Sequence, residues 1–341
     1  MQIIHSSVNR VFSGALLSIM VFYPWNAKSE LPPGKKIDWK EPAPVLFSPQ
    51  IVSTEDDEFG PTFTPDGTTI YFTKRNASTI SSNVMVICYS TLKNGNWTTP
   101  QIAPFSGKYK DFNPSISPDG TTLFFISDRK SPTKTKNDTD IWMVKKSGSG
   151  WTDPVNLGAP VNSAGWELGC SVANDGTIYF SSTGKTGNLD LYRSRILNGK
   201  YQEPENLGDS VNSEFAETDP FIAPDQSYLL FSSQGRPDAI CGKGASADYA
   251  RSDLYISFRK DGKWTRAKNL GAVVNSPADE SGPTVSKDGS TLYFTSERNF
   301  IELPMKVKLT YSYLEQHLHG TANGLGDIYE FPMTELLKNL Q

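Results

Sequence analysis

Residues 114–127 read PSISPDGTTLFFIS, and this stretch decides the fold because the chain contains it five times. Two short alternating runs flank an Asp-Gly turn, which is the pattern of a β-hairpin. The other copies are PTFTPDGTTIYFT at 61–73, CSVANDGTIYFSS at 170–182, PFIAPDQSYLLFSS at 220–233 and PTVSKDGSTLYFTS at 283–296. Their turn aspartates lie 53, 56, 50 and 63 residues apart, at Asp66, Asp119, Asp175, Asp225 and Asp288. Spacing of this kind predicts a repeat architecture.

Each copy is expected to continue into a third and a fourth strand. The third strand begins at one equivalent position, which is occupied by Val86, Asp140, Asp190, Asp253 and Asp327. Eleven residues later, four copies have an aromatic residue, namely Trp97, Trp151, Tyr201 and Trp264. This constant spacing indicates a second hairpin of fixed length. Four antiparallel strands cannot bury both faces alone, but radial stacking of such sheets can, so the repeat predicts a β-propeller.

The two ends of the repeat region predict the number of blades. The fifth copy stops after its third strand, whereas residues 44–53 (PVLFSPQIVS) have the fourth-strand pattern and align without a gap on 154–163. We therefore predict an all-β, five-bladed propeller of four-stranded antiparallel blades, in which residues 44–53 complete the last blade. The propeller is predicted to span 44–335, and 336–341 a C-terminal tail. Its repeats start near 58, 111, 167, 217 and 280.

The first 29 residues have the pattern of a secretory signal peptide. The apolar run at 11–23 is shorter than the roughly 20 residues that a membrane helix needs, and Ala27 and Ser29 provide small residues for cleavage. We expect 1–29 to be removed and 30–43 to be a linker. This predicts a periplasmic or secreted bacterial protein with no membrane span in the mature chain. An uncleaved anchor or a buried N-terminal strand is the alternative.

Composition excludes several classes of function. Lys and Arg total 33 against 37 Asp and Glu, a net charge of −4, so no basic surplus favours nucleic-acid binding. Hydrophobic residues make up 37% of the chain and aromatic residues 11%, with 27 Gly and 23 Pro, which is typical of a β-rich protein. Only three histidines are present, including His5, so we predict no zinc site, no His-dependent triad and no cofactor.

The three cysteines allow at most one disulfide bond in an exported protein. Cys88 falls in a predicted strand and is expected to be a small buried residue. A bridge between Cys170 and Cys241 and three free thiols remain alternatives.

The Pro-Asp-Gly turn, the Tyr-Phe-Thr-Ser-x-Arg stretch and the later Asp-Ile-Tyr resemble the WD40-like β-propeller repeat of the TolB propeller and of exported bacterial proteins. The resemblance covers about residues 44–331 and implies the fold. It does not imply one function, because such propellers serve many functions. The chain also has five units where TolB has six, and no room for the N-terminal α/β domain of TolB.

One acidic residue precedes each first strand by three positions, on the face that also carries the loops between second and third strands. These are Glu58, Asp111, Glu167, Glu217 and Glu280. A basic residue follows each second strand: Arg75, Arg129, Lys185, Arg236 and Arg298. The carboxylates either ring the channel mouth and bind a cation or a polyhydroxylated ligand, or they pair with these basic residues and join the blades. We favour pairing, because a group found in every blade is what a blade requires.

Function is expected where the copies differ. The distance from the second-strand Phe to the third-strand position is 14, 15, 10, 22 and 33 residues, so blades 4 and 5 carry long insertions at 234–251 and 299–326. Residues 306–318 are expected to form a short amphipathic helix over the channel mouth. The ligand-binding candidates are Trp166, Phe215, Arg236, Tyr249, Arg298, Tyr311, Tyr313, His317 and His319. The pair of loop histidines has metal-ligand residue types, but its spacing alone does not predict a metal site.

These observations favour a monomeric binding propeller that recognises a protein or a polysaccharide on the face with the long loops. The alternative is a carbohydrate-active enzyme, similar to five-bladed glycosidases, which uses the repeated carboxylates. A carboxylate without a basic partner would favour the enzyme, and fully paired carboxylates would favour the binding protein.

Overall fold

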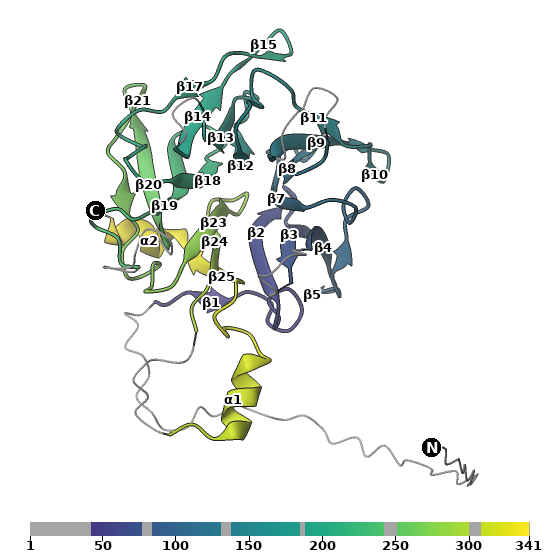
Figure 1. Cartoon of the computed structure of the whole chain (residues 1–341), viewed down its shortest axis with the longest axis vertical. Coiled ribbons are helices and arrows are strands. Elements are labelled where there is room, and N and C mark those ends of the chain that lie inside the picture. The colour runs from purple at the N-terminus through teal and green to yellow at the C-terminus, as the bar shows by residue number, and fades with distance from the viewer. Residues whose placement is uncertain are drawn as a thin grey trace, which may run out of the picture. The chain divides into compact units, whose positions relative to one another are not determined.

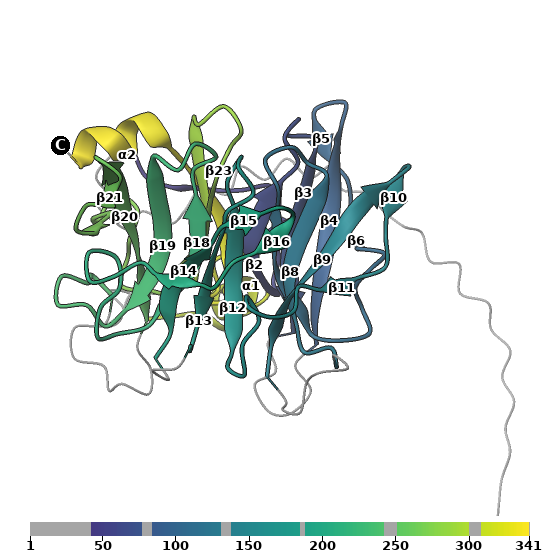
Figure 2. The ribbon, with the colours of Figure 1, turned by 90° about the horizontal axis from the view of Figure 1, so that it is seen from above.

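The computed structural model describes residues 42–76, 84–130, 138–184, 188–241, 251–299 and 308–340, all within one compact unit, Trp39–Gln341. Five antiparallel sheets stand around a central axis (Figure 1). The predicted five-bladed β-propeller is therefore confirmed. Seen from the side, the long strands run along the axis, and α2 and the β4–β5 turn lie at the same end (Figure 2).

Each blade is built outward from the strand nearest the axis, in sequence order. Blade 1 comprises β2 (Asp57–Phe63), β3 (Thr69–Arg75), β4 (Met85–Lys93), β5 (Asn96–Trp97) and β6 (Gln101–Ile102). Blade 2 comprises β7 (Asp111–Ile116), β8 (Thr122–Ser127), β9 (Asp140–Ser147), β10 (Gly150–Trp151) and β11 (Val155–Asn156). Blade 3 comprises β12 (Glu167–Val172), β13 (Ile178–Ser182), β14 (Asp190–Ser194) and β17 (Glu205–Asn206), with a separate hairpin of β15 (Ile196–Leu197) and β16 (Lys200–Tyr201).

The last two blades follow the same plan. Blade 4 comprises β18 (Glu217–Ile222), β19 (Tyr228–Gln234), β20 (Ser252–Lys260), β21 (Lys263–Trp264) and β22 (Lys268–Asn269). Blade 5 comprises β23 (Glu280–Val285), β24 (Thr291–Ser296), β25 (Asp327–Pro332) and, from the other end of the chain, β1 (Val45–Leu46). The helices are α1 (Tyr311–Leu318) and α2 (Met333–Asn339).

The Asp-Gly turns fold locally because the aspartate satisfies the turn itself. In blade 1, Asp66 Oδ1 accepts hydrogen bonds from the Thr64 hydroxyl at 2.6 Å and from the Thr68 amide at 3.0 Å. Gly67 follows at φ 69°, a left-handed conformation that glycine adopts without strain. The turn sequence therefore explains why this hairpin recurs in each copy.

The N-terminal strand closes the ring as predicted. β1 pairs with β25 in antiparallel register, Val45 with Glu330 and Leu46 with Tyr329. The next residue, Phe47, is buried, and its ring lies 5.6 Å from the ring of Trp97 and 5.4 Å from that of Tyr293. Blade 5 is thus held together by the two ends of the chain, with β1 as its outermost strand.

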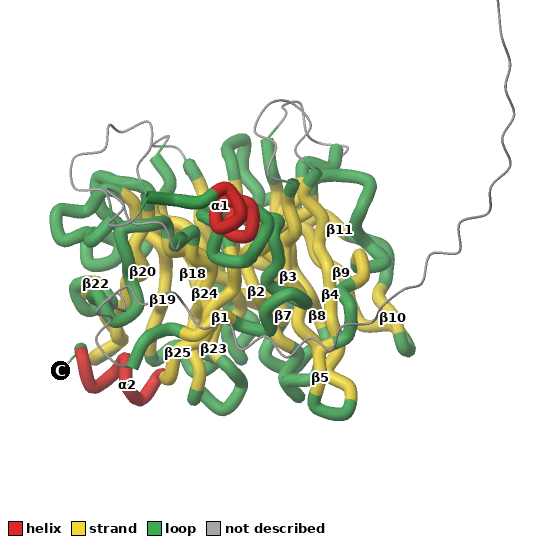
Figure 3. Tube along the Cα trace, turned by 90° about the horizontal axis from the view of Figure 1, so that it is seen from below, coloured by secondary structure: helices red, strands yellow, loops and turns green. Residues whose placement is uncertain are grey.

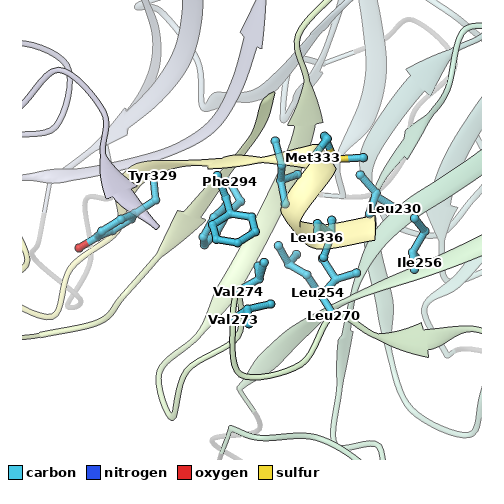
Figure 4. Close-up of a cluster of buried hydrophobic side chains, with 12 residues drawn as sticks. Leu230, Leu254, Ile256, Leu270, Val273, Val274, Phe294, Tyr329, Met333 and Leu336 are labelled. Carbon is cyan, nitrogen blue, oxygen red and sulfur yellow. The ribbon is translucent and has the colours of Figure 1, made fainter. Parts of the chain in front are cut away.

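A large side chain fills the seam between most pairs of neighbouring blades. Trp151 of blade 2 packs against Tyr71 of blade 1, and Trp264 of blade 4 packs against Tyr179 of blade 3. At the seam between blades 4 and 5, α2 takes this place, with Leu336 fully buried among residues of both blades (Figure 4). Part of the predicted C-terminal tail therefore belongs to the core.

All three cysteines are buried free thiols, so the Cys170–Cys241 bridge is not formed. Cys88 lies in β4 of blade 1, as expected. Neither helix of the described part is long and apolar enough to cross a membrane.

Candidate functional site

The five repeated carboxylates are all buried with no exposed surface. In blade 2, Asp111 pairs with Arg129 at 2.9 Å, and the Arg129 guanidinium lies 5.2 Å from the centre of the Phe125 ring and donates to the Phe105 carbonyl. Blades 4 and 5 repeat this arrangement through Glu217–Arg236 at 2.8 Å and Glu280–Arg298 at 3.3 Å. The expected pairing with arginine is therefore found in these blades. Each pair lies within one blade, however, where it joins the inner strand to the end of the second strand and to the preceding loop, and does not join two blades directly.

Blade 1 departs from the predicted pairing. Arg75 was expected to pair with Glu58, but it forms an ion pair with Asp57 instead. Glu58 pairs with Lys74 at 2.9 Å. The reason is the strand register, which places Glu58 opposite Lys74 and Asp57 opposite Arg75.

Blade 3 lacks the arginine. Gly184 stands two residues after Ser182, where blades 2 and 5 have their arginine, and the predicted partner Lys185 lies outside the described residues. Glu167 Oε1 accepts from the hydroxyls of Ser163 and Ser182 at 2.8 Å each, whereas Oε2 has no hydrogen-bond partner in the described part of the chain. Burial raises the pKa of Glu167 to about 7.

This pKa predicts a pH-dependent stability that Glu167→Gln removes. The folded chain holds the proton more tightly than the unfolded chain, so Glu167 lowers the free energy of unfolding progressively as the pH rises from its usual pKa of 4.5 to about 7. Between pH 5 and pH 8, urea unfolding should show the variant gaining on the order of 3 kcal/mol over the wild type. Glu217→Gln, which breaks an ion pair, should lose stability at both pH values. An unchanged difference for Glu167→Gln between the two pH values would contradict the assignment.

The aspartates that open the third strands also have structural partners. Asp140, Asp190 and Asp253 accept from the side-chain amides of Asn156, Asn206 and Asn269 at 2.8, 2.9 and 2.6 Å. Each pair lies within one blade and joins β9 to β11, β14 to β17 or β20 to β22. Asp327 accepts from the Ala322 amide at 2.6 Å, and burial raises its pKa to about 7.

The ligand-binding candidates do not gather at one place. Arg236 and Arg298 belong to the buried ion pairs, and Tyr249 lies outside the described residues. Phe215 is partly buried and lies so close to Gly235 that a Cβ there would meet its ring at 2.8 Å. Trp166 is 48% exposed and remains available to a ligand.

The predicted helix exists, but it does not cover the channel mouth. Thr310 caps the N-terminus of α1, because its hydroxyl accepts a hydrogen bond from the Tyr313 amide at 3.2 Å. None of the residues of α1 is buried. It lies outside the ring of blades, on the side of β1 and β25 (Figure 1), and toward the end of the propeller opposite α2 (Figure 3). The Asn323 side chain donates to the Glu55 carbonyl at 3.0 Å and so connects the loop after α1 to the segment before blade 1.

The remaining candidates lie on or after this helix. Tyr311 is 76% exposed, and Tyr313 stacks on His317 with ring centres 3.8 Å apart. His319 is exposed, 3.8 Å from Glu55 and 3.9 Å from Glu315. Among the residues that the structure describes, no group of three or more His, Cys, Asp or Glu side chains is placed to hold a metal ion.

The channel is closed at its middle by residues that sequence reasoning did not single out. The five inner strands approach the axis at Gly60, Asn113, Gly169, Asp219 and Gly282, around a cavity of only 40 Å³. The Asn113 amide donates across the axis to Asp219 Oδ1 at 2.8 Å, and a Cβ on Gly60 would lie 2.7 Å from Asn113 Oδ1. The mouth is therefore the entrance of a closed pit and not of an open channel.

The mouth itself is lined by residues that differ between blades. We use the term mouth ring for the residue before each repeated carboxylate together with its backbone partner at the end of the second strand. The ring consists of the pairs Asp57/Arg75, Lys110/Asp128, Trp166/Thr183, Ala216/Gln234 and Asp279/Glu297. The sequence contains a signal for these residues, because positions next to the repeated carboxylate differ from copy to copy although the carboxylate itself does not.

Charges in the mouth ring are distributed unevenly. Blades 5 and 1 contribute Asp279, Glu297 and the Asp57–Arg75 ion pair. Burial and the neighbouring carboxylates Asp279 and Asp57 raise the pKa of the half-buried Glu297 to about 7, against the effect of Arg75 and Arg251. Blade 3 contributes the exposed indole of Trp166 on another part of the ring. The ring thus combines hydrogen-bonding carboxylates with an aromatic surface.

No protein-family model and no curated protein matches this chain. Solved structures similar to it include a putative TolB from Agrobacterium tumefaciens, with 15% identity and a TM-score of 0.45 over 81% of this chain and 90% of that chain. A puromycin-hydrolysing peptidase from Mycobacterium tuberculosis has 12% identity and a TM-score of 0.41, over 70% of this chain but only 34% of its own. The xyloglucan PUL GH43B of Bacteroides ovatus has 14% identity and a TM-score of 0.46, over 83% and 53%.

Proposed function

We propose that this chain is an exported binding propeller that recognises a protein or a polysaccharide at the mouth ring. One observation carries the proposal: every residue of the mouth ring except Asp57 keeps exposed surface, whereas the five repeated carboxylates have none. Trp166 offers a face for stacking, and Glu297 and Asp279 offer acceptors for hydroxyl or amino groups. A rigid ring of strands presents these groups in fixed positions, which reduces the entropy lost on binding.

The enzyme alternative has weaker support. A general acid or nucleophile must contact the substrate, and none of the five repeated carboxylates has exposed surface. Glu167 has no basic partner in the described part of the chain, the feature expected of a catalytic acid, but it is enclosed like the other four. Export is proposed from residues 1–29, which lie outside the described residues, as does the predicted linker at 30–43 except for its last two residues.

The test is binding of the mature chain to a panel of polysaccharides and peptides. Trp166→Ala is expected to weaken binding at least tenfold, because stacking on an exposed aromatic contributes on the order of 1.5 kcal/mol. Glu297→Gln keeps the shape of the ring and is expected to weaken binding of the same ligand. Affinity would be measured by isothermal titration calorimetry.

Lys93→Ala is the matched control, because Lys93 is exposed on the β4–β5 hairpin at the opposite end of blade 1. It should bind as the wild type does. Equal binding by wild type and both mouth-ring variants would contradict the proposed site. Turnover of a panel member by the wild type, lost in Glu297→Gln, would instead support the enzyme.

A further inference from the structure

A second cavity lies between blades 2 and 3, on the face with the Asp-Gly turns. Its volume is 610 Å³, within the range of small-ligand sites. Phe124, Met143 and Leu157 of blade 2 and Tyr201 of blade 3 form its apolar lining. We call this cavity the seam groove.

Comparison of the five seams shows why the groove lies here. Tyr201 occupies the position of Trp97, Trp151 and Trp264, which fill the seams to the preceding blades. At the seam between blades 4 and 5, α2 fills the same place. The seam between blades 2 and 3 therefore has a phenol where three others have an indole.

On the face with the Asp-Gly turns, hydrogen bonds join neighbouring blades at two other seams but not, among the described residues, at this one. The Trp151 indole donates to the Tyr71 hydroxyl at 3.1 Å at the seam between blades 1 and 2. Gln226 bridges blades 3 and 4, accepting from the Tyr179 hydroxyl at 2.9 Å and donating to Asp175 at 2.8 Å. Within the described ranges, no hydrogen bond joins the two walls of the seam groove. Its walls are thus free to hold an inserted group.

The rim of the groove is positively charged in a chain whose net charge is −4. Lys145 and Lys200 line it from opposite blades, and both are exposed without an ion pair to any described residue. Asp119 is also present, but its carboxylate already accepts from the Ser117 hydroxyl at 2.6 Å and the Thr121 hydroxyl at 2.9 Å. These hydrogen bonds lower the pKa of Asp119, so it stays ionised, and the rim carries two lysines against one carboxylate. The remaining excess of positive charge favours an acidic ligand.

We propose that the seam groove binds an aromatic side chain carried on an acidic segment of a partner protein. The inserted ring takes the place that an indole fills at the neighbouring seams, and flanking carboxylates pair with Lys145 and Lys200. The site lies at the other face from the mouth ring and is independent of the function proposed above.

The probe for this site is the dye-labelled peptide Asp-Asp-Trp-Asp-Asp, blocked at both ends and followed by fluorescence polarisation. The mature wild-type chain is expected to bind it, and Tyr201→Trp is expected to bind at least tenfold more weakly because its own indole fills the groove. That variant reproduces the residue of three other blades, and thermal unfolding confirms that it is folded. Lys145→Glu combined with Lys200→Glu should weaken binding at least tenfold as well.

Two controls separate this site from others. The peptide with Ala in place of Trp should not bind, and equal binding would overturn the proposal because the apolar groove would not be used. Trp166→Ala should bind the original peptide as the wild type does, and loss of binding there would place the site at the mouth ring. Absence of binding to the wild type up to about 1 mM peptide, or equal binding by Tyr201→Trp, overturns the proposal.

Discussion

Replacing Arg129 by Met is expected to lower the free energy of unfolding by about 3–5 kcal/mol. The guanidinium is the only basic group paired with Asp111 among the described residues, and both side chains are nearly or fully enclosed. Without it the Asp111 carboxylate remains buried with two serine hydroxyls, Ser106 and Ser127, as its remaining side-chain donors. The loss would be measured by chemical unfolding at neutral pH.

A second variant distinguishes this loss from a packing defect. Asp111→Leu combined with Arg129→Met removes both charges and should recover part of the stability, since apolar residues replace buried ion pairs at little cost. Arg195→Met is the matched control, because Arg195 is largely exposed and its pair with Glu205 at 3.3 Å is expected to contribute less than 1 kcal/mol. Similar losses for Arg195→Met and Arg129→Met would be inconsistent with the role assigned to the buried pair.

Phe47→Ala is expected to destabilise the chain by about 3–5 kcal/mol, the usual cost of removing a large buried ring. Phe47 is only 7% exposed and contacts aromatic rings of blades 1 and 5, so it anchors the strand that closes the propeller. The effect should reach both blades, because Phe63 and Trp97 belong to blade 1 and Tyr293 to blade 5. Thermal and urea unfolding would measure it.

Val45→Ala is the control for ring closure. Val45 lies in the same strand, pairs with Glu330 through its backbone, and is 60% exposed. Its replacement should change stability by no more than about 0.5 kcal/mol. If the two variants lost stability equally, the anchoring role of Phe47 would have to be abandoned.

Most of the fold could be predicted because its determinants are local. The Asp-Gly turn, the alternation of the flanking strands and the constant spacing to Trp97, Trp151, Tyr201 and Trp264 each describe contacts within one blade. Closure could be predicted as well, because 44–53 repeat the pattern of 154–163, and β1 and β11 indeed begin at the corresponding residues Val45 and Val155.

The candidate site was less predictable because it depends on contacts between blades. In blade 1, Glu58 pairs with Lys74, and Arg75 pairs with Asp57 instead of Glu58. This choice of partners follows from strand register and not from distance along the sequence. The loop after α1 is connected to the segment before blade 1 by the contact of Asn323 with Glu55, residues at opposite ends of the propeller sequence. Neither contact leaves a local pattern.

The sequence by itself determined five four-stranded units, their closing strand and the presence of one carboxylate at the same position of each unit. The tertiary structure alone decided that Asn113 and Asp219 close the axis, that Glu167 has no guanidinium beside it among the described residues, and that the seam between blades 2 and 3 holds a cavity. The physical reason is that turns and alternating strands are specified by neighbouring residues. Contacts between side chains of different blades form only once the five units are folded around one axis, so neighbouring residues in the sequence do not specify them.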